Sequence, residues 1–184
     1  MSVQSELADK RGIATALNSL GQLAHAQDDY AAARRLYQES LSLSQEIADP
    51  RGMAFSLNGL GVIVWVQGDY ATAQRLLEEA RSLQRQVGDR PGLAHSLNYL
   101  GNLAWAQGDT ATAQHLYDES LVIERELGDK QGTAYSFALH REPGTGAGRL
   151  RSRAPWTKRA WRFGGASATC GASPSRSSTW AKRS

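Results

Sequence analysis

The chain has little of several residue types, and each shortage excludes a class of protein. Its 184 residues include a single cysteine, Cys170, which excludes an internal disulfide framework and a cysteine-ligated zinc site. No apolar run is long enough to span a bilayer, and the first residues lack the basic flank and apolar core of a signal peptide. We therefore expect a cytoplasmic protein with no membrane partner.

Charge is unevenly distributed along the chain. Residues 1–136 hold 11 Lys/Arg and 17 Asp/Glu, whereas residues 137–184 hold 10 Lys/Arg and one acid, Glu142. The net charge of +3 therefore comes from the C-terminal stretch alone. Because such asymmetry suggests an arm for nucleic acid or a membrane, nucleic-acid binding through this stretch is one alternative function.

What the chain does have is a motif that recurs every 40 residues. Asp-Lys-Arg-Gly-Ile-Ala at 9–14 returns as Asp-Pro-Arg-Gly-Met-Ala at 49–54, Asp-Arg-Pro-Gly-Leu-Ala at 89–94 and Asp-Lys-Gln-Gly-Thr-Ala at 129–134. A fixed period of this length is typical of stacked repeats. Since such arrays form extended concave surfaces that bind other proteins, we expect a binding protein and not an enzyme.

Each repeat is predicted to contain two antiparallel helices. In residues 50–89, apolar and small residues recur at helical spacing before and after a break at Gly68-Asp69. Glycine permits the turn, and Asp69 is suited to cap the following helix. One hairpin cannot bury its apolar face alone, so neighbouring hairpins must stack. The residues at helical spacing are Leu57, Leu60, Gly61, Val64, Ala73, Leu77 and Ala80.

These positions resemble the tetratricopeptide repeat family in its 40-residue variety. The first helix carries a Leu-Gly pair, and the second carries a small residue followed four positions later by a large one. The resemblance covers residues 1 to about 137 and implies an all-α fold, an α-solenoid of antiparallel hairpins with a right-handed superhelix. The matching residues are Leu20-Gly21, Leu60-Gly61, Leu100-Gly101, Ala33, Ala73, Ala113, Tyr37, Leu77 and Tyr117.

The repeats are expected at residues 10–49, 50–89 and 90–129. Residues 1–9 align with residues 41–49, so we expect them to be the remnant of a preceding second helix. Residues 130–139 begin a fourth repeat. Residues 140–184 are expected to form a disordered basic tail. These irregular ends favour a fragment of a larger regulatory protein, and a non-functional gene fragment is a further alternative.

We hypothesise that the tail is translated out of frame. Residues 141–153, back-translated with GC-rich codons and read one base later, can encode G-N-L-A-R-A-Q-G-D-Y-A-A-A, which resembles residues 101–113. Residues 156–183, read two bases later, can encode the second half of a repeat and the start of another. Two frameshifts, near residues 140 and 155, would explain both matches.

The resemblance implies that the first helix of each pair lines a concave groove that binds a protein or peptide ligand. Asn18, Asn58 and Asn98 form a row whose amides suit a peptide backbone; alternatively, each Asn bonds a neighbouring repeat. Trp65 and Trp105 are either aromatic anchors or packed between hairpins. The candidate groove residues are Asn18, Gln22, His25, Phe55, Asn58, Trp65, His95, Asn98, Asn102 and Trp105, with Thr15 and Val62 in the same register.

No other site is predicted. The four histidines form no paired i, i+4 motif with His or Cys, so we expect no metal. No catalytic set or phosphate loop stands out, and we expect no cofactor and no nucleic-acid partner. The acids of the second helices, Glu78, Glu79, Glu119 and Glu124, are expected on a solvated outer face with i, i+4 partners.

Overall fold

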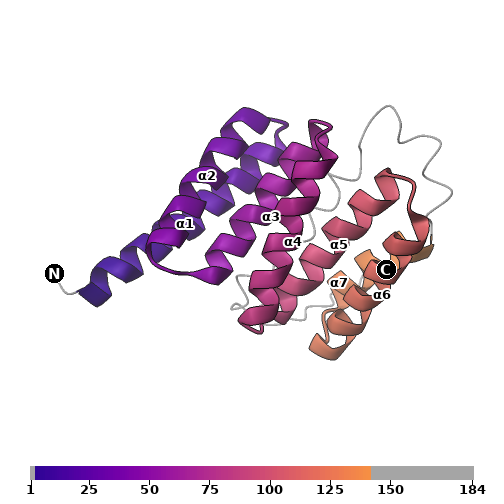
Figure 1. The fold of residues 1–184 in the computed structure, drawn as a ribbon. Helices are drawn as coiled ribbons and strands as arrows, with labels where there is room; N and C mark the ends of the chain where they lie inside the picture. Colours follow the sequence, from indigo (N-terminus) through magenta and orange to yellow (C-terminus); the bar gives the residue numbers. More distant parts are fainter. Residues whose placement is uncertain (1–2, 142–184) are drawn as a thin grey trace, which may run out of the picture.

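The computed structural model describes residues 3–141, which form consecutive helices with no strand in that range. They pack as neighbouring hairpins in chain order (Figure 1). This arrangement confirms the all-α solenoid. The helices are α1 (Val3–Ala26), α2 (Tyr30–Glu46), α3 (Pro50–Val66), α4 (Tyr70–Gln86), α5 (Arg90–Ala106), α6 (Thr110–Leu127) and α7 (Lys130–Arg141).

Aspartates begin the helices that follow each turn. The Asp69 side chain accepts a hydrogen bond from the Thr72 backbone N–H, and Asp109 does the same for Thr112. These bonds satisfy N–H groups that have no partner within the helix. The turn itself needs a left-handed residue, and Gly68 supplies it with φ of +90°. The recurring Gly-Asp pair therefore determines where each second helix starts.

The Leu-Gly pair allows the two helices of a hairpin to cross closely. A Cβ built on Gly61 would lie 2.9 Å from the Leu77 side chain, and one on Gly101 would lie 2.5 Å from the Tyr117 ring. Any larger residue would have to push these side chains away. The large residue of the second helix thus fills the space that glycine leaves on the first, as the sequence predicts.

The core is formed both within each hairpin and between each second helix and the first helix of the next repeat. Leu60 and Ile63 of α3 pack with Tyr37 of α2. Leu97 and Leu100 of α5 belong to a buried cluster with α4, and burial of each leucine contributes roughly 1.5–3 kcal/mol. Stability therefore depends on contacts between adjacent repeats as much as on single hairpins.

The start of the chain differs from its expected form. Residues 3–9 are helical, but they run without a turn into α1, whereas the aligned segment ends at Ala48 in a left-handed turn with φ of +51°. At Ala48 the turn is accompanied by packing of α2 against α3. Among the described residues, no preceding helix packs on residues 3–9 to bring about such a turn, and the straight helix keeps its backbone hydrogen bonds.

At the other end, α7 includes the predicted start of a fourth repeat at 130–139 and packs against α6. The predicted tail and its frameshifts fall on residues 140–184, of which 142–184 lie outside the described residues. None of the described helices is long and apolar enough to cross a membrane.

Candidate functional site

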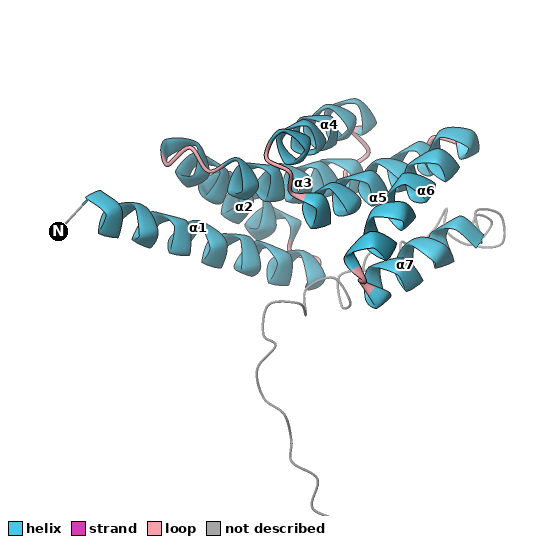
Figure 2. Cartoon of the chain, turned by 90° about the horizontal axis from the view of Figure 1, so that it is seen from below, coloured by secondary structure: helices cyan, strands magenta, loops and turns pink. Residues whose placement is uncertain are grey.

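The odd-numbered helices form one layer of the array and the even-numbered helices form the other. α1 contacts α3, and α3 contacts α5, in addition to the contacts between consecutive helices. Figure 2 shows an arch with α1 and α7 at its two ends and α4 on its outer side. The odd helices therefore line the inner side of the arch, where a concave face was expected.

Three residues in the same register are exposed on this inner layer. Thr15 on α1, Phe55 on α3 and His95 on α5 follow one another at 40-residue intervals. Phe55 is 39% exposed although it is aromatic. An exposed aromatic side chain on a concave layer is suited to anchor a ligand.

The Asn row lies in the seams between repeats. The Asn58 Nδ2 donates to Ser96 Oγ over 2.8 Å, and Asn98 Nδ2 donates to Ser136 Oγ over 2.9 Å. Asn18 Oδ1 lies 2.9 Å from Ser56 Oγ. All three asparagines are buried. The interpretation that each Asn bonds a neighbouring repeat is therefore confirmed, and binding of a peptide backbone by the same amides stays a prediction.

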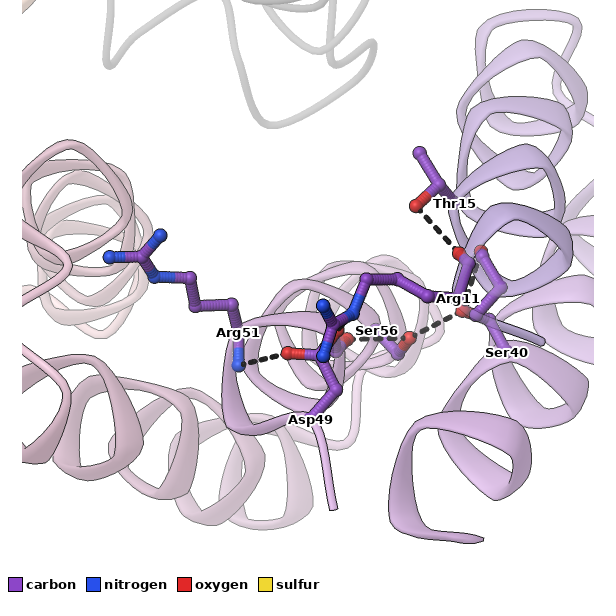
Figure 3. A network of polar contacts seen from close by, with 8 residues as sticks. Arg11, Thr15, Ser40, Asp49, Arg51 and Ser56 are labelled. Carbon is purple, nitrogen blue, oxygen red and sulfur yellow. Dashed lines mark hydrogen bonds and ion pairs between the residues drawn. The ribbon is translucent and has the colours of Figure 1, made fainter. Parts of the chain in front are cut away.

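The serines that meet these asparagines were not singled out from the sequence. Ser56, Ser96 and Ser136 are fully buried and recur every 40 residues. Ser56 Oγ also lies 3.0 Å from Ser40 Oγ, which in turn donates to the Ala14 carbonyl (Figure 3). The 40-residue period of these serines was the one sequence signal that could have identified them. Because serine is usually exposed, residue type alone gave no reason to place them between two repeats.

Two exposed arginines, Arg11 and Arg51, lie on helices of the same layer. Arg11 Nε lies 3.2 Å from the Asp49 carboxylate, which forms an ion pair between α1 and the start of α3. The Arg51 side chain extends away from Asp49 in Figure 3, while its backbone N–H donates to the Asp49 carboxylate. Arg51 is exposed, so it provides a positive charge one turn from Phe55.

The remaining predicted groove residues differ in burial. Gln22 and Trp105 are half-buried, whereas Trp65 and Asn102 are buried. Asn102 Oδ1 accepts a hydrogen bond from the Tyr117 hydroxyl over 2.8 Å. His25 is also buried, and burial lowers the pKa of its imidazole while Asp28 opposes the shift. These buried residues belong to the core of the array as well as to its inner layer.

The expectation for Glu124 is wrong. Its side chain is buried between α6 and the neighbouring odd helices and is only 2% exposed. Glu124 Oε1 lies within hydrogen-bonding distance of three donors, namely Ser136 Oγ (2.9 Å), Ser120 Oγ (3.1 Å) and Asn98 Nδ2 (3.1 Å). The helical register of α6 turns this position toward the seam, where Gln84 lies one repeat earlier.

The carboxylate of Glu124 is only partly satisfied. Its Oε2 is buried without a hydrogen-bond partner among the described residues. Burial raises the pKa of Glu124 above its usual 4.5, the three hydrogen bonds oppose that rise, and Asp129 adds to it. By contrast, Glu78 and Glu119 form surface ion pairs with Arg81 and Arg85.

Within residues 3–141, no group of three His, Cys, Asp or Glu side chains could hold a metal ion. The alternative of nucleic-acid binding depends on the basic tail, which lies outside the described part of the chain. The inner layer of odd helices is therefore the strongest candidate site that the described residues contain.

Comparisons with known proteins agree with this architecture. Two family models described as tetratricopeptide repeat match residues 13–51 and 52–134. Among solved structures, the TPR domain of Arabidopsis FLU superposes with a TM-score of 0.56 at 20% identity, covering 65% of this chain and 99% of that domain. BtubC (BKLC) from P. vanneervenii superposes with a TM-score of 0.62 at 18% identity, covering 93% of this chain and 70% of that one. At these identities the likeness concerns the fold. No curated protein matches the chain.

Proposed function

Because the chain belongs to the tetratricopeptide repeat family, whose repeats generally mediate protein–protein interactions, we propose that it is a scaffold that binds an extended segment of a partner protein. The proposed binding face is the inner layer formed by α1, α3 and α5. The observation that carries this proposal is the exposed row of Thr15, Phe55 and His95, because these side chains stand on successive inner helices at the repeat period.

The chemistry of this row indicates the kind of segment that it would bind. Phe55 and the half-buried Trp105 provide aromatic surface, and Arg51 provides an exposed positive charge. A segment with an apolar anchor and a nearby carboxylate would complement these groups. His95 on α5 and Gln22 on α1 could add polar contacts to such a segment.

The buried members of the predicted site act indirectly in this proposal. Asn18, Asn58 and Asn98 hold adjacent repeats together, so they set the spacing of the exposed row. Trp65, Asn102 and His25 are buried on the same helices. Their substitution would alter binding through the curvature of the array.

A peptide library displayed on phage and selected on the full chain would test the proposal. We expect the selected peptides to bind at least tenfold more weakly to Phe55→Ala, because truncation of an aromatic hot-spot residue costs about 2 kcal/mol or more. The matched control is Val122→Ala, which truncates an exposed apolar residue on α6, in the outer layer. Peptides whose binding is unaffected by Phe55→Ala but lost in Val122→Ala would overturn the proposed face.

A further inference from the structure

A buried polar cluster joins α7 to the helices before it. Ser136 of α7 is fully buried; its Oγ lies 2.9 Å from Glu124 Oε1 of α6 and accepts a hydrogen bond from Asn98 Nδ2 of α5 over 2.9 Å. Ser120 Oγ of α6 lies 3.1 Å from the same carboxylate oxygen. Because a buried polar group is costly unless it is satisfied, the docking of α7 depends on how well these four side chains satisfy one another.

Glu124 is the member of this cluster that can change its charge. Its Oε2 is buried without a hydrogen-bond partner among residues 3–141. The backbone of α7 closes over the carboxyl group, since a Cβ built on Gly132 would lie 3.0 Å from the Glu124 carboxyl carbon. Separation of α7 from α6 would therefore open the carboxylate to water. An ionised Glu124 bears a desolvation cost only while α7 is docked, and that cost opposes docking.

The two preceding repeats place neutral groups at the same position. Ser44 and Gln84 align with Glu124, and both are buried. Gln84 accepts a hydrogen bond from Ser96 Oγ of α5, as Glu124 does from Ser136 of α7. The packing of α5 on α4 therefore involves no titratable group at this position, which makes α5 an internal reference for α7.

We propose that Glu124 is a pH-dependent switch, which holds α7 in its docked position when the carboxyl group is protonated and weakens that docking when the group ionises. A protonated carboxyl group is neutral and can donate to Ser136 Oγ. Ser136 can then donate to Asn98 Oδ1, which lies 3.1 Å away. Since α7 is an odd-numbered helix, its release would shorten the inner layer by one helix; this consequence for binding rests on the proposed function, whereas the switch itself does not.

The direction of the response follows from the burial of Glu124. Burial raises the pKa of its carboxyl group above the usual 4.5, against the hydrogen bonds from Ser136, Ser120 and Asn98. The docked state therefore binds this proton more tightly than the undocked state does. Docking is strongest below about pH 4.5 and weakens as pH rises through the pKa of the docked state.

Other charged and titratable side chains lie around the cluster. Asp129, in the turn between α6 and α7, raises the pKa of Glu124 and also favours protonation of His95 on α5. Arg125, Asp129 and Lys130 line an open cleft beside this turn. Because histidine ordinarily titrates between pH 5 and 8, a His95→Gln variant is needed to assign a pH response to Glu124.

Hydrogen exchange followed by mass spectrometry on the full chain tests the switch. Protection factors, corrected for intrinsic exchange rates, are compared for α7 and α5 at about pH 4.5 and about pH 7.5. We expect the protection of α7 to fall at least about fivefold at the higher pH, and that of α5 to stay within about twofold. Glu124→Gln should keep α7 protected at both pH values. Glu126→Gln, which removes an exposed acid of the same helix, and His95→Gln should both behave as the parent.

A further variant tests the hydrogen bonds themselves. Ser136→Ala removes the partner of Glu124 on α7 and should lower the protection of α7 at both pH values. The proposal would be overturned by equal protection of α7 at both pH values in the parent, by the same fall in Glu124→Gln, or by loss of the fall in His95→Gln. Unchanged protection of α7 in Ser136→Ala, or a parallel fall of α5 and α7, would overturn it as well. Because the measurement uses no ligand, its failure would leave the proposed binding face untouched.

Discussion

Replacing Glu124 by Gln should stabilise the protein at neutral pH. Gln keeps an oxygen for the donors Ser136, Ser120 and Asn98, and it removes a buried charge whose Oε2 has no partner among the described residues. Leaving a buried polar group unsatisfied costs about 1–3 kcal/mol, and more for a charged one. The preceding repeat uses this solution, since Gln84 accepts from Ser96 Oγ at the same position.

The gain should depend on pH. The folded-state pKa of Glu124 is raised above the value of 4.5 that we take for the unfolded chain, so the folded state binds this proton more tightly. The parent therefore loses stability as pH rises from about 4.5 through the folded pKa, and it regains that stability when acidified. Glu124→Gln removes this loss. The stabilities of the variant and the parent should therefore differ at pH 7 and become equal near pH 4.

Thermal unfolding followed by circular dichroism would measure the difference. A gain of about 1–3 kcal/mol corresponds to a rise in Tm of several degrees for a chain of this size. The control is Glu126→Gln on the same helix, which removes only an exposed ion pair with Arg90 and should change stability by less than about 1 kcal/mol. A lower Tm for Glu124→Gln at pH 7, or an equal rise in Tm at pH 4, would refute this explanation.

Three further predictions concern seams, turns and caps. Asn58→Ala and Ser96→Ala should each destabilise the array, because the two side chains form a hydrogen bond. A double-mutant cycle measured by urea unfolding should give a coupling free energy of about 0.5–3 kcal/mol. Additive effects of the two substitutions would contradict this bond. Ala48→Gly should stabilise the protein by about 1 kcal/mol, because Ala48 has a left-handed φ of +51°. Ala8→Gly, at the aligned position inside α1, should destabilise it. The midpoints of urea unfolding would measure both changes. Hydrogen bonds from Thr72 lower the pKa of Asp69 in the folded state. The stability that the Asp69 carboxylate contributes is therefore present above pH 3.8 and is lost as pH falls through the folded pKa. Asp69→Asn should make the fall of Tm on acidification shallower.

Much of the fold could be predicted because its signals are local. The 40-residue period, the glycine at each turn and the capping Asp69 each act within a few residues, so the alternation of helices follows from neighbours in the chain. The close contact of Gly61 with Leu77 could also be predicted, because only a small residue permits that crossing. The place of Phe55 on a first helix followed from its register within the repeat.

What the tertiary structure decided is where polar side chains go when two repeats meet. Glu124 and Glu119 both lie on α6, yet one is buried among serines and the other pairs with Arg85 on the surface. Sequence spacing could not separate them, because their burial depends on the angle at which α7 and α5 pack on α6. Likewise, the sequence left two roles open for Asn58, and only the approach of Ser96 showed that its amide lies in a seam. Local rules determine helices, whereas satisfaction of a buried polar group depends on a partner some 40 residues away.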